Sequence, residues 1–345
     1  MTPDAFSRSL KGERSFSSIE IARLADELGK DVHWLITGRP DAMRPRVAAR
    51  HFFDQESKTH HVPGREQDEA VLLDIALAYR QAYPEDVGYV HPECEVPATV
   101  DEIRDRLKSC FVRPFIDRVE GELAVDVVRV KEISTSYTLR IGTHTVIVIP
   151  ATANWFFENW SIAHELGHIA VHDMDVDLPT AKRSVHETRA NAFAAKLLLP
   201  ADTMRSVDWA CITPDELAQR IWEYGVSTVA LHTRLTTLRL PASDLIAKWA
   251  APGGTFRLLR AAGDALGGSG TDPTHLIAER SLYASQRRFP ISLQEAHMKR
   301  IARGEIGKET LAWMLGVKQD QLEEIDTPAE TATVGAGELA EMLGF

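Results

Sequence analysis

Two histidines and a glutamate in one short motif have the residue types and spacing to bind a metal ion and act on water. The run His164-Glu165-Leu166-Gly167-His168 fits the pattern H-E-x-x-H. Residues four apart on a helix share a face, so both imidazoles can reach one zinc ion at about 2.0–2.1 Å. The glutamate between them is then placed to act on water at the fourth zinc position. The alternative is a helix with two buried histidines whose hydrogen bonds are satisfied within the protein.

A zinc site of this kind needs a third protein ligand, for which we favour Glu187. A metzincin would have glycine and histidine where this chain has Val171 and Met174, so that class is excluded. Glu187 opens a second helix with an apolar face, and a charged side chain there needs a partner. Asn191, one turn later, is placed to hydrogen-bond that ligand. The alternative for Glu187 is a first-turn glutamate favoured by the helix dipole.

Alternating and helical hydrophobic patterns predict the elements around this motif. A strand at 125–130 and a hairpin at 137–149, turned at Gly142, precede the motif helix at 155–172. The hairpin could supply an edge strand that holds an extended peptide substrate. Further helices are predicted at 18–28, 32–36, 67–82, 100–110, 184–199, 214–239 (split at Gly225) and 275–325. Gly- and Pro-rich residues 251–274 mark a boundary.

Composition and charge indicate a globular protein of two or three domains. The 345 residues are 44% hydrophobic and 26% charged, and the net charge is −11. This acidic balance excludes a polybasic nucleic-acid coat protein, although a local DNA-reading module remains possible. Cys94, Cys110 and Cys211 are widely spaced and form no C-x-x-C pair. We therefore expect neither a disulfide framework nor a thiolate zinc cage.

The sequence also predicts a cytoplasmic location. The first residues lack the apolar region and small-residue cleavage site of a signal peptide. Uncharged apolar runs fall short of the ~18–20 residues that span a bilayer, so no membrane partner is expected.

Two runs of residues flank the motif: Trp160-Ser161-Ile162-Ala163 precedes it, and Glu187-x-x-x-Asn191-Ala192-Phe193-Ala194-Ala195-x-Leu197-Leu198-Leu199-Pro200 follows it. Together with the motif, these runs resemble the ImmA/IrrE family of zinc metallopeptidases. The resemblance covers roughly residues 70–240. It implies that His164, His168 and Glu187 are zinc ligands and that Glu165 is the general base. Asn159-Trp160 replaces the arginine–phenylalanine pair usual in the family, a change that affects packing rather than the metal.

The N-terminus resembles the back half of an XRE-type helix-turn-helix domain. The similarity lies in Thr2–Gly12, in Ile21–Gly29 and in Trp34–Gly38. It implies that Pro3–Leu10 is a recognition helix on which Ser7, Arg8 and Lys11 face DNA. The usual first two helices are missing, so either the natural chain starts further upstream or the module is degenerate. The alternative is a small helical interaction module.

Together these features predict an α+β, mostly helical protein with a zincin-like metallopeptidase core. We expect a zinc metalloendopeptidase, with Tyr137, His144, His232 and Arg234 as candidates for oxyanion stabilisation. The family resemblance implies that its substrate is a transcriptional repressor or other DNA-binding protein. The alternative is a DNA-binding regulator whose peptidase-like domain is a sensor or scaffold. The expected segments are a partial helix-turn-helix at 1–45, a linker at 46–68, the peptidase core at 69–205, a helix-turn-helix-like segment at 206–250, and a helical C-terminal region with a loose tail at 251–345.

Overall fold

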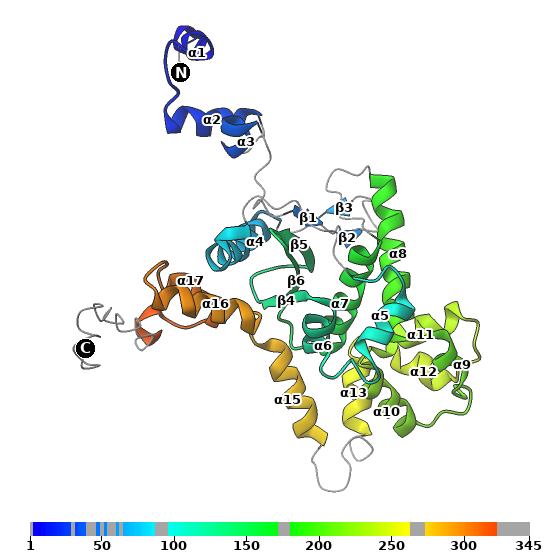
Figure 1. Ribbon diagram of the computed structural model, residues 1–345. Helices are drawn as coiled ribbons and strands as arrows, with labels where there is room; N and C mark the ends of the chain where they lie inside the picture. Colours follow the sequence, from blue (N-terminus) through cyan, green and yellow to red (C-terminus); the bar gives the residue numbers. More distant parts are fainter. Residues whose placement is uncertain are drawn as a thin grey trace, which may run out of the picture.

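A small mixed β-sheet forms the centre of the computed structural model (Figure 1). The structure describes residues 3–28, 32–38, 46–48, 52–53, 60–61, 65–86, 96–171, 180–262 and 273–322. The sheet order is β1-β5-β6-β4, in which β4 pairs parallel with β6 and the other two pairs are antiparallel. The four strands are β1 (Arg46–Ala48), β4 (Val125–Val130), β5 (Tyr137–Ile141) and β6 (His144–Pro150). A separate pair joins β2 (Phe52–Phe53) to β3 (His60–His61).

The strand sequences explain why this sheet lies inside the protein. β4 and β6 are rich in β-branched residues and are buried along most of their length, as expected for strands covered on both faces. The tight turn between β5 and β6 uses Gly142 at φ +55°, a conformation in which a side chain would be strained. The predicted strand and hairpin are therefore both present.

Helices cover both faces of the sheet and create two hydrophobic cores. Alternate residues of β4 face opposite cores, with Val125 and Val127 on one side and Val128 and Val130 on the other. The second core also contains side chains of α4 (Arg65–Ala82), α16 (Ile291–Ala302) and α17 (Glu309–Leu315). The first core contains helices from α5 to α15 in chain order: α5 (Val100–Leu107), α6 (Phe115–Leu123), α7 (Trp155–Ala170), α8 (Thr180–Leu198), α9 (Ala201–Arg205), α10 (Pro214–Tyr224), α11 (Thr228–Thr237), α12 (Asp244–Trp249), α13 (Gly254–Ala261) and α15 (Pro273–Ser285).

This arrangement confirms the predicted α+β, mostly helical fold with a zincin-like core. The described residues also form short 3-10 helices at Pro84–Asp86 and Gln319–Leu322 and three N-terminal helices, α1 (Pro3–Leu10), α2 (Ser18–Leu28) and α3 (Val32–Thr37). Among the described residues, no helix is long and apolar enough to cross a membrane.

Several elements differ from the sequence prediction. The predicted linker 46–68 includes β1, whose backbone pairs with β5, and the first residues of α4. Helix α6 was not predicted, although its buried Phe115, Val119 and Leu123 recur at four-residue spacing. Helix α13 lies within the predicted boundary at 251–274, where Leu258 and Leu259 are fully buried. The predicted loose tail from residue 323 lies outside the described residues.

The predicted segment limits do not coincide with gaps in packing. Leu217 and Leu235 belong to the same core as Ile162 of α7, and Ala284 of α15 joins them. Backbone hydrogen bonds of 2.8 Å in both directions also join Arg129 of β4 to Arg288 after α15. The C-terminal elements are therefore structural neighbours of the sheet, and the division into domains stays a prediction.

Candidate metal centre

Helix α7 carries the H-E-x-x-H motif through the middle of the protein. Asn154 caps its first turn by accepting a hydrogen bond from the Phe157 amide at 3.2 Å. The helix is apolar on most of its circumference, and its residues from Ser161 to Ala170 are all buried. A helix of this kind belongs inside a protein, so the polar side chains of the motif need specific partners.

Helix α8 packs closely against α7 beside the motif. A Cβ atom added at Gly167 would lie 3.0 Å from Phe193 Cβ and 3.1 Å from the Ala190 Cα. Two arginines from other helices bind carbonyl groups at the C-terminal end of α8. Arg104 donates to the Leu197 carbonyl at 2.7 Å, and Arg234 donates to the Leu199 carbonyl at 2.9 Å. The helix dipole favours cations at its C-terminal end, so the two arginines stabilise the position of α8.

The two helices bring His164, His168 and Glu187 together. The two histidine Nε2 atoms are 3.1 Å apart, and Glu187 carboxylate oxygens lie 3.3 Å from His164 Nε2 and 3.4 Å from His168 Nε2. Both histidines are buried, and the side chain of Glu187 is 26% exposed. Tetrahedral ligands with bonds of about 2.0–2.1 Å lie about 3.3 Å from one another. With one donor atom taken from each residue, the three atoms lie within 4.8 Å of one another, so the three side chains converge closely enough to share one metal ion.

Asn191 determines which nitrogen of His164 faces this cluster as an acceptor. Its side-chain oxygen lies 2.9 Å from His164 Nδ1. Because an amide oxygen only accepts hydrogen bonds, Nδ1 is the donor in this contact, which leaves Nε2 as the nitrogen that can present a lone pair to the cluster. Such an outer hydrogen bond is typical of metal-binding histidines. The structure thus places Asn191 against a histidine rather than against Glu187.

Glu165 is fully buried next to the cluster and is oriented by the sheet. The Thr138 hydroxyl of β5 donates to Glu165 Oε2 at 2.7 Å, and Thr138 is itself fully buried. Thr138 was not identified from the sequence as a partner of Glu165. Its signal was a small polar side chain between two large apolar ones in a strand that precedes the motif helix.

The four candidates for oxyanion stabilisation lie elsewhere or have other partners. The Tyr137 hydroxyl donates to Asp68 at 2.6 Å, and His144 stacks on Tyr83 at 4.3 Å, both on the α4 side of the sheet. Arg234 binds the end of α8, as described above. His232 is half-buried on α11.

The N-terminal candidates for DNA contact are all exposed. Ser7 and Arg8 lie on α1, and Lys11 follows it directly. Arg8 Nε lies 3.7 Å from a Glu13 carboxylate oxygen, a distance at which an exposed ion pair contributes little. His172, the other histidine near the motif, lies outside the described residues.

The close packing at Gly167 gives a stability prediction. Gly167→Ala should lower the free energy of unfolding by about 1–3 kcal/mol, because the added methyl group crowds Phe193 and the α8 backbone. Urea denaturation of the full chain measures the change.

Gly121 provides a matched control because it also lies within a helix. A Cβ atom there meets nothing within 4 Å. Gly121→Ala should therefore be neutral or raise stability by up to about 1 kcal/mol through helix propensity. Equal effects of the two substitutions would show that α7 and α8 do not depend on close contact at Gly167.

A comparison with known protein families gives a match over part of the chain. Residues 125–236, which extend from β4 through most of α11, match the family model described as the IrrE N-terminal-like domain, a peptidase family. No curated protein and no solved structure gives a significant match. The match at residues 125–236 supports the ImmA/IrrE family and a metallopeptidase-like function for this chain.

Proposed function

We propose that the protein is a zinc-dependent endopeptidase whose metal ligands are His164, His168 and Glu187. The observation that supports this proposal most directly is the convergence of the three side chains: the two histidine Nε2 atoms are 3.1 Å apart, and the two Glu187 carboxylate oxygens lie 3.3 and 3.4 Å from them. Three acceptor atoms that face one another in a largely buried site repel unless a proton or a cation lies among them. Two imidazoles and one carboxylate also form a donor set that suits zinc and leaves a fourth position open.

We propose Glu165 as the general base. A zinc ion bound at this site would supply a Lewis acid that lowers the pKa of water and polarises a peptide carbonyl. Thr138 holds one oxygen of the Glu165 carboxylate, which sets the orientation of the group. In this proposal Glu165 takes the proton from the attacking water and passes it to the leaving amine. Burial of Glu165 keeps that proton from exchanging freely with bulk water.

The outer edge of β5 is the proposed position for the substrate backbone. An extended peptide can add to an exposed strand through main-chain hydrogen bonds, with side-chain pockets providing specificity. In this structure β1 lies along that edge, and Ala48 pairs with Thr138, the residue that orients Glu165. We therefore infer that β1 must leave before an extended protein substrate can bind beside the catalytic glutamate.

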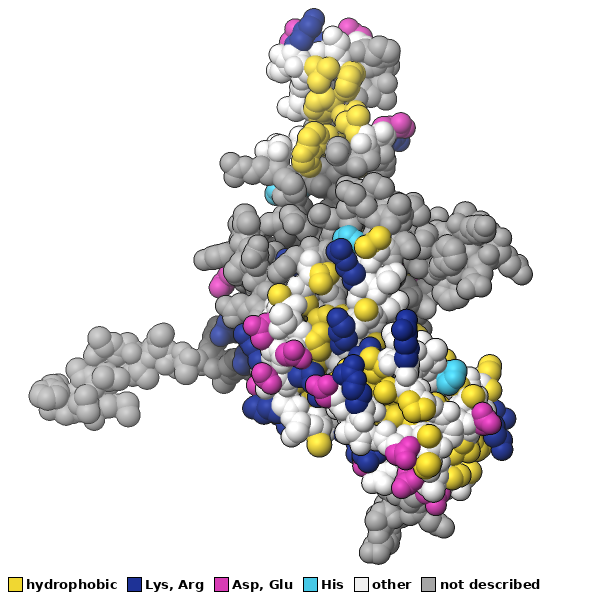
Figure 2. All heavy atoms as spheres, turned by 90° about the vertical axis from the view of Figure 1, so that its right-hand side faces the viewer, with side chains coloured by type: hydrophobic (Ala, Val, Ile, Leu, Met, Phe, Trp, Pro, Cys, Tyr) yellow, Lys and Arg dark blue, Asp and Glu magenta, His cyan; other side chains and the backbone are white. Residues whose placement is uncertain are grey.

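A repressor or another DNA-binding protein is the proposed substrate, on the basis of the family resemblance. The N-terminal helices are proposed to bring the peptidase to DNA, with Ser7, Arg8 and Lys11 available for phosphate contact. Figure 2 shows hydrophobic side chains gathered over these helices at the top of the view. Leu10, Ile19 and Ile36 are each about two-thirds exposed, so the described part of this module leaves apolar surface for a partner.

The catalytic assignment is tested by Glu165→Gln, which keeps the shape of the side chain. The wild-type chain should contain about one zinc ion, as a site with three protein ligands predicts. It should also cleave one member of a panel of purified repressors or unfolded casein. Glu165→Gln should retain zinc and cleave about 10²–10⁴-fold more slowly, because only the general base is lost. Metal analysis and mass spectrometry of the products measure the two effects.

Two further variants separate metal binding from catalysis. His168→Ala should lose both zinc and cleavage, whereas Glu223→Gln, which changes an exposed glutamate of α10, should retain both. Equal cleavage by Glu165→Gln and wild type would refute the catalytic role. A chain without zinc that still cleaves would refute the metal assignment.

The position of β1 predicts that weaker pairing increases activity. In an antiparallel pair, one of the two consecutive amides of Val47 and Ala48 faces β5. Val47→Pro combined with Ala48→Pro therefore weakens the pairing and should raise kcat/KM several-fold on the protein that the cleavage assay shows to be a substrate. Val47→Ala keeps the backbone donor and should change kcat/KM little. Unchanged or lower activity of the proline variant would show that β1 does not occupy the substrate position.

The proposed DNA contact predicts a salt-sensitive gel shift with the region upstream of the gene. Arg8→Ala combined with Lys11→Ala should weaken binding and lower the salt slope by about 1 for each lost phosphate contact. Arg205→Ala, on the exposed surface of α9, is the control and should bind as wild type does. A double variant that binds DNA normally would contradict the assignment of these residues.

A further inference from the structure

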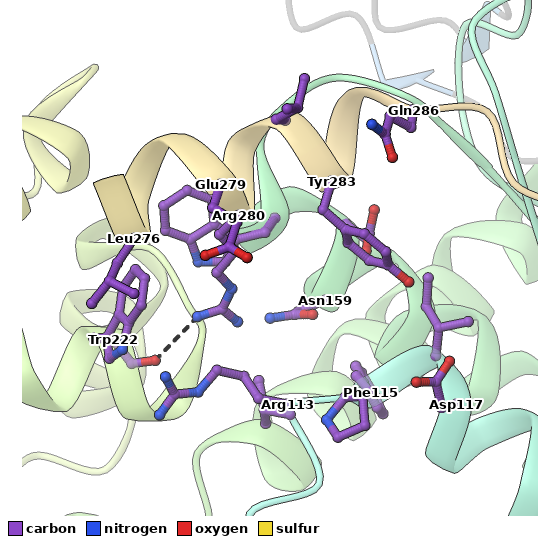
Figure 3. Close-up of a pocket in the computed structure, with 16 residues that line it drawn as sticks. Arg113, Phe115, Asp117, Asn159, Trp222, Leu276, Glu279, Arg280, Tyr283 and Gln286 are labelled. Carbon is purple, nitrogen blue, oxygen red and sulfur yellow. Dashed lines mark hydrogen bonds between the residues drawn. The ribbon is translucent and has the colours of Figure 1, made fainter. Parts of the chain in front are cut away.

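A cavity of about 680 Å³, separate from the candidate metal centre, lies between the start of α7, the segment before α6, the end of α10 and helix α15 (Figure 3). Its volume falls in the range of roughly 300–1,000 Å³ typical of small-molecule sites. Trp155 and Asn159 line it from the first turns of α7, and Leu276 lines it from α15. The cavity thus joins the motif helix to the C-terminal elements, which lie outside the matched family domain.

Two arginines in this cavity share an aromatic ring. The Arg280 guanidinium carbon lies 5.0 Å from the ring centroids of both Trp155 and Trp222. The guanidinium carbon of Arg113 lies 5.4 Å from the Trp222 centroid. Figure 3 shows Arg280 pointing into the cavity toward Asn159. Aromatic faces stabilise a cation, but they provide no counter-charge.

The acidic side chains of the cavity wall either form ion pairs with arginines other than Arg280 and Arg113 or are exposed. Glu158 forms a buried ion pair with Arg129 at 2.7 Å, and Asp117 lies 3.5 Å from Arg288. Glu279 is exposed on α15. Among the described residues, no carboxylate lies within ion-pair distance of Arg280, whose hydrogen bond to the Trp222 carbonyl is long at 3.5 Å.

The charges around Arg280 therefore favour the binding of an anion in the cavity. Burial and the nearby charge of Arg113 lower the pKa of Arg280 to about 9, and the charge of Glu158, which is paired with Arg129, offsets only part of this effect. Arg280 therefore stays protonated at neutral pH with its charge only partly compensated. Arg288 differs from Arg280 because it has a carboxylate partner. Arg288 also lies in a partly buried position, yet Glu120 accepts two short hydrogen bonds from it, at 2.7 and 2.6 Å.

We propose that this cavity binds a small organic anion, with its carboxylate or phosphate between Arg113 and Arg280. The apolar body of the ligand packs against Phe115 and Leu276, which line the same cavity. Guanidinium groups hold both carboxylates and phosphates through paired hydrogen bonds. The site uses none of the proposed zinc ligands, so this proposal does not depend on the peptidase proposal.

The experiment uses four probes that separate charge from shape. 1-Naphthaleneacetate and 1-naphthyl phosphate carry the two kinds of anion, 1-naphthaleneacetamide is neutral, and inorganic phosphate has no apolar body. Isothermal titration calorimetry on the full chain, with and without zinc, should show at least one naphthyl anion binding about tenfold or more tightly than the amide and than phosphate. The better of the two naphthyl anions identifies carboxylate or phosphate as the natural group.

Charge-removing variants locate the site. Arg280→Met and Arg113→Met should each weaken binding of the anion about tenfold and leave the amide unchanged. Arg303→Met is the matched control, since Arg303 is 66% exposed after α16, and it should bind as wild type does. Arg113 is exposed, so its variant is expected to fold even if the Arg280 variant does not.

Four results would overturn the proposal. They are equal binding of amide and anion, equal binding of phosphate and naphthyl phosphate, undetectable binding of both naphthyl anions, and undiminished binding by Arg113→Met. Equal cleavage by Glu165→Gln and wild type, which would refute the peptidase proposal, would leave the outcome of these titrations unaffected. Failure of the cavity proposal and failure of the peptidase proposal are therefore distinguishable.

Discussion

The close approach of α7 and α8 at Gly167 is the contact on which the candidate metal centre depends. It places a carboxylate from one helix within 3.4 Å of two imidazole nitrogens from the other. These donor atoms repel one another unless a proton or cation lies among them, so packing has to hold them together. Arg104 and Arg234 contribute by binding the C-terminal carbonyls of α8, far along the helix from Glu187.

The sheet provides the second constraint through the alternation of side chains along β5. Thr138 faces α7 and binds Glu165, while the adjacent Tyr137 faces α4 and binds Asp68. A shift of one residue in the pairing of β5 would exchange these two partners. The same strand pairs with β1, so one element both orients the proposed base and presents the proposed substrate edge.

The C-terminal elements are part of the same packed structure. Arg129 of β4 pairs with Glu158 of α7, and it donates to the Tyr283 carbonyl of α15 at 2.6 Å. Loss of either member of such a buried pair leaves an unpaired charge and is strongly destabilising. A ligand in the neighbouring cavity would touch α7 and α15 together. This arrangement gives the C-terminal elements a physical route to influence the motif helix.

The sequence alone determined the features that depend on local spacing. The four-residue separation of His164 and His168, the alternating strands and the turn at Gly142 follow from backbone periodicity and the conformational freedom of glycine. The sequence also suggested Glu187 as the third candidate ligand, because a charged side chain on an apolar helix needs a partner. The resemblance of the motif and its flanks to a known family supplied the proposed roles of these residues.

Tertiary structure alone decided which distant residues meet. Thr138 lies 27 residues from Glu165, and Arg104 lies 93 residues from Leu197, so no local pattern links either pair. The pairing of β1 with β5 and the shared stacking of Arg113 and Arg280 on Trp222 are of the same kind. Such contacts depend on how whole elements pack, and one-dimensional periodicity contains no information about that geometry.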